Sequence, residues 1–185
     1  GDPGAVERAE TLLEAPEGAV TLGQVDGLVV EEPDAVSDGV VVLPLSSAVA
    51  QHPELVEPHL GRIVAAESGD KFVAGNDADW TGGAFVYVPR GVHLSAPVLA
   101  TAISDAAGVS LNRRVLVVLD EGAEAEVWEQ YLSGSADGET LLNTTIALVV
   151  GKNARLRFVW AQALNEQAAI FGSAPRIEAF TLSGE

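Results

Sequence analysis

An apolar run, a three-residue turn and an alternating run of apolar and polar residues recur three times along this chain, 31 residues apart. The three copies occupy residues 85–94, 116–125 and 147–156. Gly91, Gly122 and Asn153 stand at the same place in the three turns, and these residue types accept a left-handed backbone at little steric cost. Self-similarity at a fixed period of this length is typical of a solenoid. Because the repeated runs are of β type, the pattern predicts a mainly β fold, a parallel β-helix with coils of about 31 residues.

Stacking at this period predicts columns of equivalent side chains on neighbouring strands, which lie about 4.8 Å apart. Two apolar columns are expected to face inward: Leu94, Ala125 and Leu156, and Ala96, Val127 and Phe158. The outward columns between them are His93, Glu124 and Arg155, and Ser95, Glu126 and Arg157. We therefore expect Glu124 to lie near Arg155, and Glu126 near Arg157. Each such pair on neighbouring strands contributes about 0.2–1 kcal/mol, so the pairs set the register more than they add stability.

The first 70 residues carry a different pattern, and they predict a small α/β N-terminal part (1–70) before the β-helix core (71–185). We expect a helix at 6–14, β-type runs at 19–22, 27–31 and 39–43, and return strands in the core at 98–103 and 168–172. A second helical segment is expected to have Pro53 as its first helical residue and Ser46 or Ser47 as a cap. A fourth repeat begins at Ala179 and is interrupted, so we expect an incomplete core and a fragment of a longer chain.

The composition restricts the chemistry that this chain can perform. The 185 residues contain no Cys, which excludes disulfides, thiolate metal sites and Cys nucleophiles within this stretch. A net charge of −17, from 27 acidic and 10 basic residues, argues against nucleic acid and anionic membranes as partners. The sequence shows neither a secretory leader nor an apolar run of membrane length, so we expect a soluble protein of the cytoplasm.

The segment Pro89-Arg-Gly91-Val-His93 admits a metal-binding interpretation, because it nearly matches the second motif of the cupin β-barrels. The cupin pattern needs one more residue before its His, and the first cupin motif is absent upstream. The chain has three His, of which His52 and His59 would lie two helical turns apart. We therefore expect no metal ligands and a solvent-facing His93, and a cupin-like metal-binding protein remains an alternative.

An acidic run follows the second turn, and clustered carboxylates of this kind are used by β-helix enzymes that cleave polysaccharides. Its members are Asp120, Glu121, Glu124, Glu126 and Glu129. The charge columns account for Glu124 and Glu126 without chemistry, so we expect no catalytic residues and keep a polysaccharide lyase or glycosidase as an alternative. The chain also lacks the Gly-x4-Gly-Lys-Ser/Thr loop that ATP hydrolysis would need.

Asp77, Asp79 and Trp80 precede Gly82-Gly83 in an irregular stretch that could form either a binding loop or a turn. We expect a turn that directs the chain into the first coil, with Trp80 covering the open end of the core. This stretch belongs to a longer recognisable segment. Lys71-Phe-Val-Ala-Gly-Asn76, followed by Trp80-Thr-Gly-Gly-Ala-Phe-Val-Tyr-Val-Pro-Arg-Gly-Val92, resembles the SufB/SufD family of iron–sulfur cluster assembly proteins.

The likeness extends over roughly residues 39–185 and includes the upstream strand and helix and the later repeats. SufB-like chains usually carry a Glu-Gly-Cys motif after the second turn, where this chain reads Glu129-Gln-Tyr-Leu-Ser-Gly134, so the resemblance favours a SufD-like, truncated member. It implies a right-handed parallel β-helix that acts as a non-catalytic scaffold subunit in a cytoplasmic complex. No catalytic, cofactor-binding or metal-binding residue can be carried over onto these positions.

The resemblance also implies partners. These are a SufB-like subunit and a SufC-like ATPase, the latter bound through a C-terminal region that lies outside these residues. The iron–sulfur cluster would then belong to the whole complex, with no cofactor in this stretch. Because a cut solenoid exposes an unpaired strand, we also expect a homodimer through the coil end near residues 176–185.

Overall fold

The computed structural model describes residues 15–34, 36, 38–60, 76, 80–134, 138–172 and 175–179. Their elements are β1 (Val20–Val25), β2 (Leu28–Glu31), β3 (Val41–Pro44), α2 (Leu45–Gln51), α3 (Pro53–Val56), β4 (Gly82–Val88), β5 (Val98–Ser104), β6 (Val109–Leu119), β7 (Glu124–Ser133), β8 (Thr140–Val150), β9 (Arg155–Ala163), β10 (Ala168–Gly172) and β11 (Arg176–Ala179). The short strands expected near 19–22, 27–31 and 39–43 are therefore present, as are the return strands at 98–103 and 168–172. The expected helix at 6–14 and the border at 70/71 lie outside the described residues.

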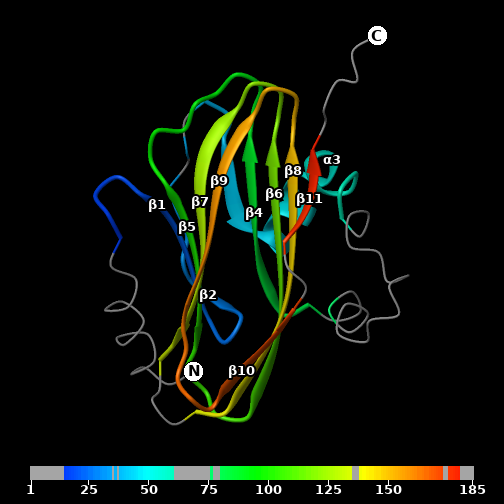
Figure 1. The fold of residues 1–185 in the computed structure, drawn as a ribbon. Helices are drawn as coiled ribbons and strands as arrows, with labels where there is room; N and C mark the ends of the chain where they lie inside the picture. Colours follow the sequence, from blue (N-terminus) through cyan, green and yellow to red (C-terminus); the bar gives the residue numbers. More distant parts are fainter. Residues whose placement is uncertain are drawn as a thin grey trace.

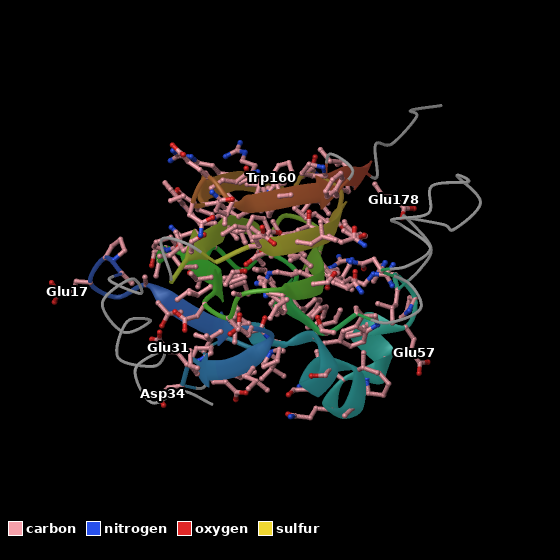
Figure 2. The ribbon with its side chains drawn as sticks, turned by 90° about the horizontal axis from the view of Figure 1, so that it is seen from below. Glu17, Glu31, Asp34, Glu57, Trp160 and Glu178 are labelled. Carbon is pink, nitrogen blue, oxygen red and sulfur yellow. The ribbon has the colours of Figure 1, made fainter. Side chains whose placement is uncertain are left out.

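The strands form two sheets that face each other (Figure 1). Sheet A has the order β2-β1-β5-β7-β9, and sheet B the order β10-β8-β6-β4-β3, with β11 also paired to β8. From β4 to β10 the chain alternates between the sheets, and every pairing among these strands is parallel. Seen from below, successive segments stack in chain order (Figure 2). On this basis we propose that the described strands form a parallel β-helix.

Sheet B carries the 31-residue register without interruption. Ala84 stands opposite Val115, and Val115 stands opposite Ile146. The turns that follow are aligned too, since the Gly91 amide donates to the Glu121 carbonyl at 2.9 Å and the Gly122 amide to the Lys152 carbonyl at 2.9 Å.

The predicted left-handed positions of these turns are confirmed. The φ angles are +68° at Gly91, +70° at Gly122 and +57° at Asn153. An ideal Cβ on Gly122 would lie 3.9 Å from the Gly91 Cα, so the two glycines are stacked neighbours. Asparagine tolerates this conformation better than most non-glycine residues, and it therefore replaces glycine in the third turn.

One predicted column in sheet A is wrong. Val127 stands opposite Val98 instead of Ala96, an offset of 29 residues, although the next pair, Val127 opposite Phe158, keeps the offset of 31. The backbone at Leu94 is still in the predicted register, because its amide donates to the Glu124 carbonyl at 2.8 Å. The chain therefore takes two extra residues before β5. Pro97, which has no amide proton to donate, lies in this extra segment.

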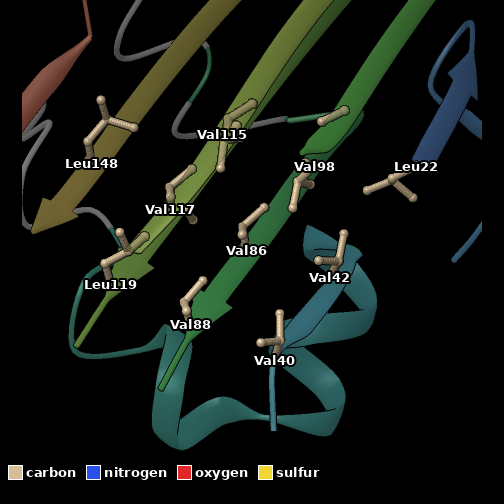
Figure 3. Packing of buried hydrophobic residues seen from close by; sticks show 14 of the residues in the cluster. Leu22, Val40, Val42, Val86, Val88, Val98, Val115, Val117, Leu119 and Leu148 are labelled. Atoms are coloured by element: carbon tan, nitrogen blue, oxygen red, sulfur yellow. The ribbon is translucent and has the colours of Figure 1, made fainter. Parts of the chain in front are cut away.

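The main core lies between the two sheets and is built from alternate residues of each strand. Val86, Val117 and Leu148 from sheet B face Val98 and Val127 from sheet A, and all five are at most 3% exposed. Figure 3 shows the valines and leucines of sheet B arranged in rows along neighbouring strands. Because side chains alternate across a strand, these rows account for half of each apolar run.

The other half of each apolar run in sheet B is covered by helices. Leu45 and Ala48 of α2 and Val56 of α3 pack on Phe85 and Leu116 from the outer face of the sheet. Pro53 is the first residue of α3, as predicted, whereas the predicted serine cap is wrong, because α2 begins at Leu45 after Pro44 and has no side-chain cap. Trp80 also packs against this outer cluster, so the prediction that it covers the open end of the core is wrong.

The fourth repeat is described only at its beginning. Strand β11 pairs in parallel with β8, and Arg176 stands opposite Ala147, an offset of 29 residues. The remainder of that repeat, from residue 180, lies outside the described residues.

Candidate functional site: a buried polar layer between the sheets

A polar layer interrupts the aliphatic core between the sheets. Its members are Gln24, Arg113, Glu129, Tyr131 and Thr144, all of which are at most 3% exposed. Strand alternation explains why they point inward. Arg113 has the same parity as Val115 and Val117 on β6, and Glu129 and Tyr131 have the same parity as Val127 on β7. The same pleat that builds the core therefore carries two charges into it.

The two charges neutralise each other across the interior. The Arg113 Nε donates to Glu129 Oε1 at 2.5 Å, and the Arg113 Nη2 donates to Glu129 Oε2 at 3.4 Å. Arg113 comes from sheet B and Glu129 from sheet A, so the pair links the two sheets. Buried charges are tolerated when they are paired and hydrogen-bonded in this way.

Gln24 completes the coordination of Arg113. Its Oε1 accepts from the Arg113 Nη1 and from the backbone amide of Gly83 at 3.2 Å. A single amide oxygen on β1 therefore contacts both β4 and β6, and it fixes the N-terminal strand onto the layer.

Burial and pairing act in opposite directions on the two ionisable groups. Burial raises the pKa of Glu129, and the Arg113 guanidinium opposes this without reversing it. For Arg113, burial acts to lower the pKa, but the Glu129 carboxylate outweighs burial and the pKa is raised. The close two-point contact is the geometry of an ionised pair, since a bidentate guanidinium–carboxylate contact is favourable in both charge and shape.

Tyr131 lies beside this pair and is completely buried. Burial raises its pKa well above 10.0, and the negative charge of Glu129 adds to the rise. The ring meets that of Trp160 edge to face, with centroids 6.3 Å apart and an interplanar angle of 83°. Its hydroxyl makes no hydrogen bond of regular geometry, although it lies within electrostatic reach of Glu129, Arg113 and Thr144. Tyr131 is therefore held as a neutral phenol.

The residues of the recognisable stretch at 71–92 serve the packing around this layer. The Asn76 side-chain amide donates to the carbonyls of Arg113 and Asn143, each at 3.0 Å. Gly83 cannot carry a side chain, because an added Cβ would lie 1.9 Å from the Arg114 carbonyl oxygen. The Thr81 amide donates to the Asn112 carbonyl at 2.8 Å. The motif thus presses β4 closely against β6. Asp77 and Asp79 lie outside the described residues.

The predicted outer ion pairs are present on sheet A. Arg155 lies 3.1 Å from Glu124, and Arg157 lies 3.1 Å from Glu126. Ser95 does not belong to the second column, because β5 follows the shifted register described above. The two arginine side chains are 80% and 70% exposed, so both pairs are in contact with solvent.

The acidic run after the second turn is divided among separate positions. Asp120 accepts from the Tyr87 hydroxyl at 2.7 Å, Glu121 pairs with Arg90 at 3.0 Å, and Glu129 is sealed in the interior. With Glu124 and Glu126 in their own pairs, these carboxylates do not gather into the joint groove that a polysaccharide-cleaving site requires.

The histidines are also separate. His93 is 64% exposed and lies 3.9 Å from Glu124, as the outward column predicts. His52 lies on the helical side beside Glu54 at 3.6 Å, and His59 borders a small hollow with Arg114 and Thr145. Among the described residues, no group of three His, Asp or Glu is close enough to bind a metal ion. The described helices are likewise too short to cross a membrane.

The sequence analysis missed Gln24, Arg113 and Tyr131 as members of the interior. A signal for Arg113 was present, because it stands two residues before Val115, on the inward parity of an otherwise apolar strand. Nothing in the sequence paired it with Glu129, which comes from the opposite sheet. Gln24 lies in the N-terminal part, outside the repeats, so the period does not place it.

Comparison with known proteins identifies the family of this chain. Residues 25–99 match the family model described as the SufBD protein N-terminal region, and residues 102–176 match the SufBD core domain of SUF system FeS cluster assembly. An iron–sulfur cluster assembly SufBD family protein of Mycobacterium tuberculosis is 31% identical over 111 residues, which cover 60% of this chain and 12% of that protein. One of Staphylococcus haemolyticus is 29% identical over 124 residues, 67% of this chain and 26% of that protein.

The chain thus spans between about an eighth and a quarter of the length of these relatives. The two family matches meet at residues 99–102, in β5, and the polar layer draws on both, with Gln24 next to the first match and Arg113 in the second. Together they cover most of the 185 residues, and this chain belongs to the SufBD family of iron–sulfur cluster assembly proteins.

Proposed function

We propose that this chain is part of a SufD-like subunit, a non-catalytic scaffold of a SUF iron–sulfur cluster assembly complex in the cytoplasm. Family membership supports the role in cluster assembly, since the matched relatives carry that function in their names. The more specific assignment to a SufD-like scaffold rests on the interior of the protein.

Tyr131 carries the choice between SufD-like and SufB-like. It occupies the third place of Glu129-Gln-Tyr131, where SufB-like chains usually carry the Cys of a Glu-Gly-Cys motif. A thiol at that place could supply a nucleophilic or metal-binding thiolate, whereas a phenol whose pKa is raised well above 10.0 stays protonated and neutral. Tyr131 instead fills the space between the sheets and packs on Trp160.

The partners of the proposed scaffold are a SufB-like subunit and a SufC-like ATPase. Parallel ladders of strands make the two sheets stiff along the stack, and the Arg113–Glu129 pair connects them through the core. A stiff body of this kind could transmit a movement of the ATPase to the SufB-like partner without changing its own internal structure. We infer a mechanical role in which the cluster is bound elsewhere in the complex.

The test uses the full-length protein, co-expressed with SufB-like and SufC-like proteins from the same cell. Affinity capture of the tagged protein is expected to recover both partners in a stable complex. The isolated full-length protein, treated with ferrous iron and sulfide, is expected to retain no stoichiometric iron–sulfur cluster. Failure to capture either partner, or a cluster bound stoichiometrically to the isolated protein, would contradict the proposed scaffold role.

A further inference from the structure

Three polar atoms at one level of the interior have no hydrogen-bond partner within the part of the chain that the structure describes. They are the Tyr131 Oη, the Thr144 Oγ1 and the Trp160 Nε1, each of which is shielded from bulk solvent. Buried donors of this kind are nearly always satisfied by protein or by ordered water. Three unsatisfied atoms beside a buried ion pair therefore indicate that something else occupies the layer.

The strand register brings these atoms around the Arg113–Glu129 pair. Thr144 stands next to Arg113 in sheet B, and Trp160 stands next to Glu129 in sheet A. The Tyr131 ring lies against Trp160, and its hydroxyl lies within electrostatic reach of Thr144. The three groups thus come from three strands and belong to one layer.

The layer also has space beside its polar groups. Gly172 stands opposite Thr144, and a Cβ on Gly172 would come to 2.4 Å from the Thr144 Oγ1, so the absence of a side chain keeps that hydroxyl uncovered. A hollow of about 10 Å³ borders Arg113 and Gln24 and reaches Ala102, the residue directly opposite Tyr131. This is about the smallest volume that holds one water molecule.

The chemistry of the set selects the occupant. Trp160 can only donate, so the occupant must accept a hydrogen bond. Glu129 presents a carboxylate on the same side, so an anion would be repelled, and a metal cation would meet the indole N–H donor. Water accepts from Trp160 and donates in the same layer, and the hydroxyls of Tyr131 and Thr144 can act in either direction.

We propose that the polar layer is a binding site for ordered water, in which at least one molecule contacts the Tyr131 Oη, the Thr144 Oγ1 and the Trp160 Nε1. The water completes the polar layer as a continuous network around Arg113 and Glu129. Such a network stabilises a buried ion pair that would otherwise be surrounded by aliphatic side chains. The inference does not depend on the proposed scaffold role.

The decisive variant is Thr144→Val, which removes the hydroxyl and keeps the shape of the side chain. If the hydroxyl binds water, the substitution removes one partner of that water, and the melting temperature is expected to fall by about 2–4 °C. If the hydroxyl is simply unsatisfied, its removal relieves a buried polar group, and the melting temperature is expected to rise. An unchanged or raised melting temperature overturns the proposal.

Thr145→Val is the matched control, because Thr145 is also buried with an unsatisfied hydroxyl but lies on the opposite face of β8. The direct measurement is a crystal structure of the unaltered chain at a resolution that shows other buried waters. Density for water within hydrogen-bond distance of the Tyr131 and Thr144 hydroxyls is expected, and it is expected to persist in Thr145→Val and vanish in Thr144→Val. A dry layer in the unaltered chain overturns the proposal whatever the variants do.

Discussion

The chain places the same pair of residue types, arginine and glutamate, in two opposite environments. On the outside of sheet A, Arg155 lies 3.1 Å from Glu124, with the arginine side chain 80% exposed. Between the sheets, Arg113 contacts Glu129 with the two side chains 3% and 0% exposed. Distance alone would rank the two contacts as similar. The solvent around them decides their effect on stability, because water and salt screen the outer pair and leave the inner pair unscreened.

The largest expected effect comes from removing one inner charge. Glu129→Gln leaves the Arg113 guanidinium buried without its counter-ion, and the free energy of unfolding is expected to fall by about 3–5 kcal/mol. Urea denaturation at neutral pH measures the change. The control is the double variant Arg113→Met with Glu129→Leu, which should recover most of the loss, because a well-packed apolar pair replaces a charged pair at little net cost. A single variant as stable as the unaltered chain would show that the inner pair resembles the outer one.

The next effect is a pH dependence that only the interior should show. Because the pKa of folded Tyr131 is well above its ordinary value of 10.0, the folded chain keeps a proton that the unfolded chain loses. The contribution of Tyr131 to stability is therefore complete below about pH 10 and decreases above it, by up to about 1.4 kcal/mol per pH unit. Comparing urea denaturation of the chain and of Tyr131→Phe between pH 9 and 11 tests this, since the variant should lose the steeper decrease. Parallel curves for the two proteins would contradict the burial of a neutral phenol.

Tyr87 is a partly exposed counterpart to Tyr131, and its titration can be followed separately. Burial, together with the hydrogen bond to the Asp120 carboxylate, raises the pKa of Tyr87 to about 12. Since the chain has two tyrosines, the ultraviolet absorbance of Tyr131→Phe reports Tyr87 alone. Asp120→Asn in that background is expected to lower the Tyr87 pKa toward 10.0 without reaching it, because burial is the larger cause. An unchanged titration curve would exclude Asp120 as a contributor.

The smallest effect is expected on the outside. Glu124→Gln removes the Arg155 pair and should change the free energy of unfolding by about 0–1 kcal/mol, because the pair is solvated. The difference should disappear as sodium chloride is raised to 1 M, where charges are screened over about 3 Å. Denaturation curves of the two proteins at low and high salt provide the measurement. A loss comparable to that of Glu129→Gln would remove the distinction between the two environments.

The period of the chain was readable from sequence because it is a local property of the backbone. Gly91, Gly122 and Asn153 adopt left-handed conformations wherever the turn requires them, and parallel ladders then bring residues 31 apart together. The Glu124–Arg155 and Glu126–Arg157 pairs follow from that spacing alone. The family resemblance at residues 71–92 was also present in the sequence, since close packing of β4 on β6 restricts which residues can stand there.

Two features depended on the tertiary structure. The register of β5 against β7 is set where the segment around Pro97 takes up two extra residues, so that Val98 instead of Ala96 faces Val127. The Arg113–Glu129 pair depends on which strands of the two sheets face each other at one level of the core, and no repeat within either sheet specifies that. Spacing along the chain determines neighbours within a sheet, whereas contacts across the interior are decided only when both sheets are packed.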